Sequence, residues 1–181
     1  MNCWRMVGFL FLIGLALWGC SGVQTPSNAI WIAQPEFVEV DNHLLRVRIA
    51  PQKGEYPYYT FFLLTLTNQS NADLIVDWNT SQYLFNGTPQ GMLVFEGIDP
   101  VAVKNAMVPP EKVAPGAALS LEIMPMRLIA WSPIKENTSG GRSISPGMLP
   151  IGENGIRLAV QHENGHITIP LSVRIFREGS P

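Results

Sequence analysis

A run of alternating apolar and polar residues on both sides of an Asn-Gly pair constrains this fold more than any other feature of the chain. Asn164-Gly165 is a strong hairpin signal, because a two-residue type I′ turn needs residues that tolerate a positive φ. If these two residues form the turn, Glu163 pairs with His166. The next pair outward is His162 and Ile167. One face of the hairpin then gathers apolar side chains: Ile156, Leu158, Val160, Ile167, Ile169, Leu171, Val173 and Ile175. Polar residues fill the other face, so the sequence predicts an antiparallel strand pair with one buried face.

Shorter segments with the same two-residue period recur through the preceding chain. In the stretch 58–68, for example, we expect Phe62, Leu64 and Leu66 to face the core while Thr65 and Thr67 face out. The ranges that we interpret as strands are 36–40, 44–49, 58–68, 74–79, 83–85, 92–95 and 119–123. Asn86-Gly87 and Pro89 indicate a turn between the strands at 83–85 and 92–95. A short helix is an option only at 101–107. Many short strands separated by turn residues predict an all-β chain that folds as a two-sheet antiparallel sandwich.

Two local patterns add to this prediction. Thr65-Leu66-Thr67-Asn68-Gln69-Ser70 is a strand that runs into a polar turn. Ala114-Pro115-Gly116 places proline and glycine at the central positions of a type II turn, ahead of the strand at 119–123. This layout resembles the immunoglobulin-like β-sandwiches of bacterial surface and periplasmic lipoproteins, although cysteines of the antibody type are absent. The resemblance implies an immunoglobulin-like antiparallel sandwich.

The N-terminus carries the pattern of an export signal. A short first segment with one positive charge, Arg5, precedes an unbroken apolar run at 7–18. The run is short for a membrane span, which takes about 20 apolar residues. Leu17-Trp18-Gly19-Cys20 closes the run and resembles the lipobox of bacterial lipoproteins, which are cut before the cysteine. An ordinary secretory signal that is cut elsewhere is the alternative.

The lipobox resemblance implies that Cys20 carries a thioether-linked diacylglycerol and an N-acyl chain. Several acyl chains make an effectively permanent anchor, since each buried methylene contributes about 0.8 kcal/mol. Ser21 stands where Asp would signal retention in the inner membrane, so the resemblance favours the periplasmic face of the outer membrane. Cleavage removes Cys3 and lipidation uses the sulfur of Cys20. The mature domain then keeps no thiol, and its stability depends on its core.

These features predict three parts of the chain. A lipoprotein signal peptide occupies 1–19, the lipidated cysteine and a tether occupy 20–35, and a single β-sandwich domain occupies 36–177. The tether contains one apolar island, at 29–32. We interpret this island as the first strand of the fold, because single apolar patches usually find a core. A membrane-proximal contact is the alternative.

Two patterns resemble metal sites. His162-Glu163-Asn164-Gly165-His166 matches H-E-x-x-H, in which both histidines of a helix bind zinc while the glutamate activates a water. Asn-Gly is a poor helix interior, and the predicted hairpin directs the two histidines to opposite faces. A zinc metalloprotease is therefore a remote alternative, and we expect no cofactor. Asp77, Asn79 and Ser81 offer oxygen ligands at alternate positions, as a calcium site would. We interpret this segment instead as a strand that leads into a turn.

The formal net charge is −2. The sequence contains no basic patch of the kind that would indicate nucleic acid as a partner. We predict a non-catalytic, lipid-anchored envelope protein that acts through protein–protein contacts, as an assembly factor or accessory subunit. Tyr83, Phe85 and Trp131 are the candidate contact residues, since aromatic side chains often anchor interfaces. Core packing is the alternative for them. The alternative function is a periplasmic module that binds a small ligand or glycan through the loops around Trp131 and Gly140-Gly141.

Overall fold

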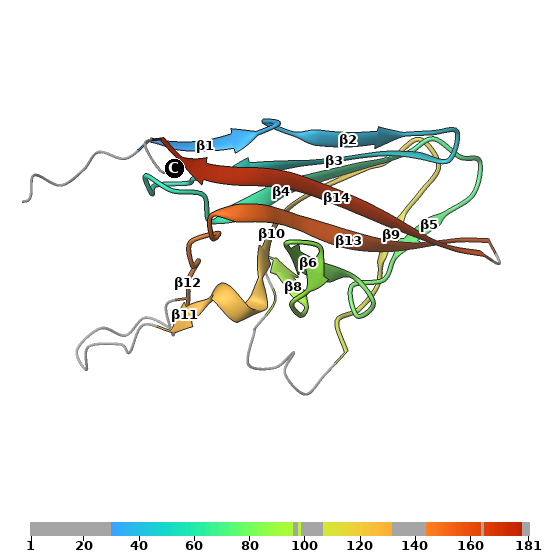
Figure 1. The fold of residues 1–181 in the computed structure, drawn as a ribbon. Coiled ribbons are helices and arrows are strands. Elements are labelled where there is room, and N and C mark those ends of the chain that lie inside the picture. Colours follow the sequence, from blue (N-terminus) through green and yellow to red (C-terminus); the bar gives the residue numbers. More distant parts are fainter. Residues whose placement is uncertain (1–29, 96–97, 99–106, 132–143, 164, 179–181) are drawn as a thin grey trace, which may run out of the picture.

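The alternating segments form strands, and these assemble into two antiparallel sheets (Figure 1). The computed structural model describes residues 30–95, 98, 107–131, 144–163 and 165–178. The larger sheet contains, in spatial order, β1 (Trp31–Gln34), β14 (Gly165–Arg177), β13 (Gly152–His162), β5 (Leu74–Val76) and β9 (Glu111–Val113). The edge of β13 that faces away from β14 pairs with two strands, β5 and β6 (Gln82–Phe85). β7 (Thr88–Pro89) pairs with β6.

The smaller sheet contains, in spatial order, β2 (Val38–Asp41), β3 (Leu45–Gln52), β4 (Phe61–Asn68), β10 (Ala118–Pro125) and β8 (Leu93–Phe95). A 3-10 turn, η1 (Met126–Leu128), follows β10, and β11 (Ala130–Trp131) pairs with β12 (Ile144–Ser145) outside both sheets. The inner faces of the two sheets share one cluster of buried apolar side chains, whose largest members include Trp78, Tyr83 and Phe62. The predicted all-β, two-sheet antiparallel architecture is confirmed.

Side-chain alternation determines which face of each strand is buried. On β4, Phe62, Leu64 and Leu66 are fully buried, whereas Thr65 and Thr67 are partly exposed. The neighbouring β3 alternates in the same way, with buried apolar residues between exposed arginines. Successive side chains of a strand point to opposite faces, so one face of each strand enters the core and the other meets water. The predicted core faces of these strands are confirmed.

The long C-terminal hairpin has the predicted faces but a different register. The structure pairs His162 with Gly165 and Val160 with Ile167, so the register that the Asn-Gly pair suggested is wrong by two residues. Glu163 adopts the left-handed conformation, with φ of 48°. A shift of two residues restores every side chain to its original face, because the side-chain period is also two. The apolar face is therefore confirmed, even though the turn begins one residue earlier.

The segment around Asn86-Gly87 divides between the two sheets. Asn86 and Gly87 have φ values of 48° and 74°, and they form the predicted turn. This turn joins β6 to β7, a short strand inside the segment that the sequence assigned to the turn. The chain then crosses to the other sheet, where the next strand, β8, pairs with β10. The sequence expectation of a strand, a turn and a strand is therefore correct locally, but the second predicted strand belongs to the opposite layer.

The domain begins earlier than the sequence boundary at residue 36. Trp31–Gln34 forms β1 and pairs along β14, from Trp31 opposite Arg177 to Gln34 opposite Arg174. The apolar island is thus a strand of the larger sheet, and the predicted tether, 20–35, includes it. The described residues do not include the predicted signal segment 1–19 or Cys20. They also leave out residues 101–106, where a short helix is possible from the sequence. Within the described part of the chain, no helix has the length and apolar character of a membrane span.

Candidate binding furrow on the larger sheet

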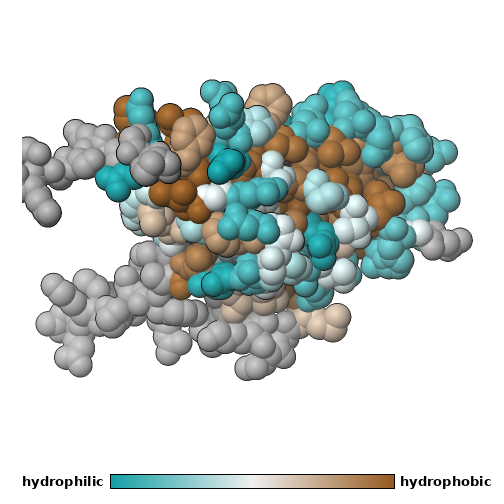
Figure 2. Space-filling model, in the orientation of Figure 1, coloured by the Kyte–Doolittle hydropathy of each residue, from teal (hydrophilic) through white to brown (hydrophobic). Residues whose placement is uncertain are grey.

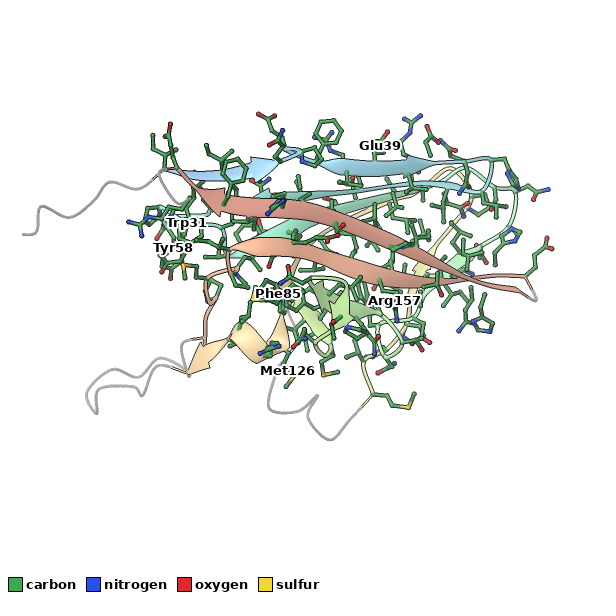
Figure 3. The ribbon with its side chains drawn as sticks, viewed as in Figure 1. Trp31, Glu39, Tyr58, Phe85, Met126 and Arg157 are labelled. Atoms are coloured by element: carbon green, nitrogen blue, oxygen red, sulfur yellow. The ribbon has the colours of Figure 1, made fainter. Side chains whose placement is uncertain are left out.

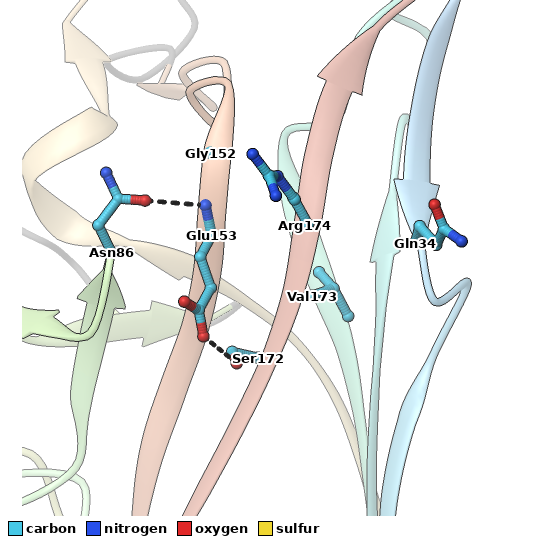
Figure 4. Close-up of a pocket in the computed structure, with 7 residues that line it drawn as sticks. All are labelled: Gln34, Asn86, Gly152, Glu153, Ser172, Val173 and Arg174. Atoms are coloured by element: carbon cyan, nitrogen blue, oxygen red, sulfur yellow. Dashed lines mark hydrogen bonds between the residues drawn. The ribbon is translucent and has the colours of Figure 1, made fainter.

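The outer face of the larger sheet carries two adjoining hollows. The first has a volume of about 450 Å³ and is lined by Gln34, Asn86, Gly152, Glu153, Ser172, Val173 and Arg174 (Figure 4). The second has a volume of about 340 Å³ and is lined by Leu84, Gly87, Glu153, Gly155, Arg157, Pro170, Leu171 and Ser172. Both hollows include Glu153 and Ser172. We call the two together the polar furrow.

Glycines keep the floor of the polar furrow low. Gly155 faces outward from β13, and a Cβ atom there would lie 2.3 Å from the backbone oxygen of Leu171 on β14. Gly152 has φ of 132°, and its Cβ would lie 2.9 Å from Oδ1 of Asn86. Side chains rarely adopt such a backbone conformation or such contacts. The close approach of these strands thus requires glycine at both positions, which leaves the sheet surface open there.

Hydrogen bonds hold the walls of the furrow in place. The backbone N–H of Glu153 donates to Oδ1 of Asn86 at 2.9 Å, and the backbone N–H of Asn86 donates to the carbonyl oxygen of Glu153 at 2.8 Å. Oγ of Ser172, on the neighbouring strand, donates to Oε1 of Glu153 at 2.5 Å (Figure 4). The Glu153 carboxylate is therefore oriented before any ligand arrives. A preorganised carboxylate loses less conformational freedom when it binds.

Both signs of charge face the furrow. In the sheet register Arg174 lies between Glu153 on β13 and Gln34 on β1, so a cation, an anion and an amide share one row. Arg157 adds a second guanidinium farther along β13. The ion pairs in the described part of the chain include neither Arg174 nor Arg157. The furrow can thus offer two guanidinium groups, a carboxylate and an amide to a polar ligand.

The predicted aromatic residues occupy different environments. Tyr83 is 1% exposed, and its hydroxyl donates to Oδ1 of Asn154 at 2.6 Å inside the core. Burial raises the pKa of Tyr83 above its usual value. Phe85 is half-buried, pairs with the buried Asn154 across β6 and β13, and packs against the core cluster. The backbone of Trp131 lies in β11, and its side chain lies outside the described residues. Tyr83 and Phe85 therefore both fit the core interpretation, and neither lines the furrow.

The two motifs that resemble metal sites have structural explanations in this fold. His162 belongs to the core-facing row of β13, whereas the exposed His166 pairs with Gln161 in the outer row, so their imidazoles lie on opposite faces. Oδ1 of Asp77 accepts backbone hydrogen bonds from Asn79 at 3.0 Å and Thr80 at 3.3 Å. Oδ2 of Asp77 accepts the Thr80 hydroxyl at 2.7 Å, and this bond is the main cause of the lowered pKa of Asp77. These oxygens hold a turn together.

The alternating pattern of the C-terminal hairpin places Ser172 and Arg174 on its polar face, but nothing in that pattern indicates a site. Glu153 on β13 and Asn86 in the turn after β6 lie 67 residues apart in the chain, and only their pairing makes a wall. One local signal was available. Gly155 lies inside the strand β13, and glycine inside a strand often marks a close backbone approach.

Comparisons with protein-family models, with curated proteins and with solved structures found no match for this chain.

Proposed function

We propose that this protein is a lipid-anchored component of the bacterial cell envelope whose β-sandwich binds a partner protein and has no catalytic role. The observation that carries the proposal is the polar furrow, in which oriented charged and amide groups border an open strip of glycine-bearing sheet. An extended polypeptide segment suits such a strip, because its backbone can approach glycines closely and its polar groups can meet the walls. We propose an assembly or accessory subunit as its place in the envelope.

The anchor rests on the N-terminal sequence. The charged segment, the apolar run at 7–18 and the lipobox pattern that ends at Cys20 support lipidation of that cysteine. Ser21 supports the periplasmic face of the outer membrane as the location. The described domain begins near residue 30, which leaves a short connection between Cys20 and the first strand. The partner would therefore meet the sandwich close to a membrane.

We propose a variant of the immunoglobulin-like architecture for the sandwich. The two antiparallel sheets and the passage from β1 in one sheet to β2 in the other support this proposal. The strand order departs from that of immunoglobulin domains, where the third strand enters the opposite sheet. Here β2, β3 and β4 are consecutive neighbours in one sheet. A crystal structure tests this proposal. Consecutive pairing of β2, β3 and β4 supports the variant, and a third strand in the opposite sheet contradicts it.

A charge reversal tests the proposed binding site. Arg174→Glu places a second negative charge beside Glu153 and is expected to abolish capture of the partner from detergent-solubilised envelopes. The matched control is Arg48→Glu, because Arg48 is exposed on the outer face of the smaller sheet. This control variant should capture the partner as the wild type does. Equal capture by both variants contradicts the furrow as the site. Failure of the wild type to enrich any partner reproducibly contradicts the proposed function.

The polar furrow also favours a glycan as a second candidate ligand. Gln34, Asn86 and Ser172 add amides and a hydroxyl to the charged groups, and such side chains hydrogen-bond sugar hydroxyls. A panel of envelope oligosaccharides should then raise the unfolding temperature of the wild type but not that of Arg174→Glu. Absence of stabilisation by every oligosaccharide contradicts this candidate.

A further inference from the structure

One end of the sandwich gathers aromatic and exposed apolar side chains around the point where the described chain begins. Tyr56 stacks on Tyr58 with ring centroids 5.2 Å apart, and Trp31 meets Tyr58 edge-on at 6.3 Å (Figure 3). All three rings are partly exposed. The apolar side chains at this end are exposed by 57% at Ile30, 44% at Met148 and 47% at Ile151. We call these six residues the aromatic end.

The sheet register brings these separate segments together. Glu178 donates its backbone N–H to the carbonyl oxygen of Ile30, which fixes Ile30 at the end of β14. Gly152 lies opposite Ile175, and Ile175 lies opposite Ala33, so the preceding residue Ile151 lies at the same end of the sheet. The backbone N–H of Leu149 donates to the carbonyl oxygen of Tyr59, which places Met148 beside the tyrosines of the β3–β4 connection. Figure 2 shows hydrophobic residues at this end of the molecule.

The aromatic end is fixed in place and nearly neutral. Nζ of Lys53 donates to the carbonyl oxygen of Trp31 at 3.0 Å and lies 5.0 Å from the centre of the Tyr59 ring. The charged side chains of the surrounding segments are those of Lys53, Glu55, Arg177 and Glu178, two of each sign. An anionic surface therefore meets no net charge of its own sign at this end. Trp and Tyr favour the boundary between lipid and water, because their rings are apolar and their polar atoms stay hydrated.

The length of chain before Ile30 limits which end of the sandwich can reach a membrane. If Cys20 is lipidated, the ten residues from Cys20 to Ile30 span at most about 36 Å when fully extended. The 13 residues of β14 extend about 43 Å from the aromatic end toward the opposite end of the sandwich (Figure 1). The aromatic end is therefore the nearest part of the sandwich to the anchor.

We propose that the aromatic end lies on the membrane surface, with Trp31, Tyr56 and Tyr58 at the level of the lipid headgroups and Met148 and Ile151 against the acyl boundary. The proposal rests on the proposed anchor at Cys20 and adds a defined orientation to it. The sandwich then stands upright on the membrane. The polar furrow, which begins at Gly152 beside this end, opens sideways just above the lipid.

The test measures the depth of a fluorophore in the full-length protein. The chain is produced with its own N-terminus, purified from membranes and reconstituted in vesicles of phosphatidylethanolamine and phosphatidylglycerol. Intact mass first shows whether residues 1–19 are removed and acyl chains are present at Cys20. An environment-sensitive fluorophore is then attached at Met148→Cys, or at His43→Cys in the exposed turn at the opposite end. Nitroxide groups on the lipid headgroups quench fluorophores at the membrane surface.

We expect several-fold stronger quenching at Met148→Cys than at His43→Cys. Adding Ile151→Asp should reduce the quenching at Met148→Cys, because a carboxylate resists transfer out of water. Met107→Asp is the matched control, since Met107 is exposed by 80% and adjoins Val108, which is hydrogen-bonded to Asn79 away from this end. That control should leave the quenching unchanged.

Each other outcome overturns a distinct claim. An acylated protein with equally weak quenching at both positions overturns the membrane contact and leaves the proposed anchor intact. A fluorophore at Met148→Cys that is shielded from water in cells but not quenched by nitroxide lipids shows that a protein covers the aromatic end, which also overturns the membrane contact. A purified protein without acyl chains overturns the proposed anchor itself, and the orientation falls with it.

Discussion

At the scale of single residues, the two buried asparagines have partners for all of their side-chain groups, whereas Nε1 of Trp78 and Nε2 of His162 are buried without one among the described residues. Asn154 is fully buried, yet all of its side-chain hydrogen-bonding groups have partners. Its Nδ2 donates to the carbonyl oxygens of Pro150 at 2.7 Å and Gly152 at 3.0 Å, and its Oδ1 accepts the Tyr83 hydroxyl at 2.6 Å. Asn68 does the same at the opposite end of the fold, where it bonds Ser70, Ala72 and Val113. A buried polar group without a partner is costly, so these pairs help to select one arrangement of the loops.

Tyr83→Phe should therefore destabilise the protein. The ring remains in the core, but Oδ1 of Asn154 loses its buried donor. The expected loss in the free energy of unfolding is about 1–3 kcal/mol, measured by urea denaturation at neutral pH. Tyr56→Phe is the control, because the Tyr56 ring is partly exposed and stacks on Tyr58. Equal stability of Tyr83→Phe and the wild type contradicts the importance of this bond.

The same substitution should change the response to alkaline pH. Burial raises the pKa of Tyr83 above the ordinary 10.0, so the folded protein holds this proton more tightly than the unfolded chain does. The contribution of Tyr83 to stability is complete below pH 10 and declines as the pH rises above that value. Tyr83→Phe should remove this part of the decline, and Tyr56→Phe should retain it. Parallel stability curves for all three proteins above pH 10 would mean that the Tyr83 hydroxyl ionises freely in the fold.

At the scale of elements, local patterns define strands but long-range pairing defines their neighbours. The alternation in β3, β4, β10 and the C-terminal hairpin predicts which face is buried, and the structure confirms those faces. The partner of β8 has no local signal, since β10 lies beyond a further strand and joins it only in the tertiary fold. Register is also decided at this scale. In the hairpin, a slip of two residues preserves both faces, so the sequence pattern fits either register equally well.

Gly155→Ala should weaken the β13–β14 pair. Its Cβ would lie 2.3 Å from a backbone oxygen of β14, and backbone atoms cannot move aside without separating the strands. We expect a loss of about 1–3 kcal/mol in the free energy of unfolding, measured by chemical denaturation. Gly165→Ala in the same hairpin is the control, because a Cβ there meets its nearest atom at 3.6 Å. Similar losses in the two variants would show that the close approach at Gly155 is not what requires glycine.

At the scale of the whole molecule, the sandwich is held together by its apolar interface. Both cysteines of the chain, Cys3 and Cys20, precede the first described residue. The core is closed by aliphatic and aromatic side chains from both sheets, with Trp78 fully buried against Phe95 at a centroid distance of 4.8 Å. Burial of apolar area is the main favourable contribution to folding in a domain of this kind.

Reducing agents should therefore leave the stability of the sandwich unchanged. The unfolding temperature of the purified full-length chain should be the same with and without dithiothreitol, measured by circular dichroism in the strand region. The reason is that no disulfide can form within the sandwich, so reduction removes no constraint on its unfolded chain. A lower unfolding temperature in dithiothreitol would reveal a bond between chains that stabilises the fold.

The sequence by itself determined the all-β class, the buried face of most strands, the tight turn at Asn86-Gly87 and the first strand at the apolar island. These features depend on side-chain period and turn chemistry, which act over a few neighbouring residues. Only the tertiary structure decided that β8 leaves its neighbours, where the long hairpin turns, and that Asn86, Glu153, Ser172 and Arg174 meet in one furrow. Those outcomes depend on pairing between distant segments, and the free energy that selects such pairing comes from packing the two sheets together.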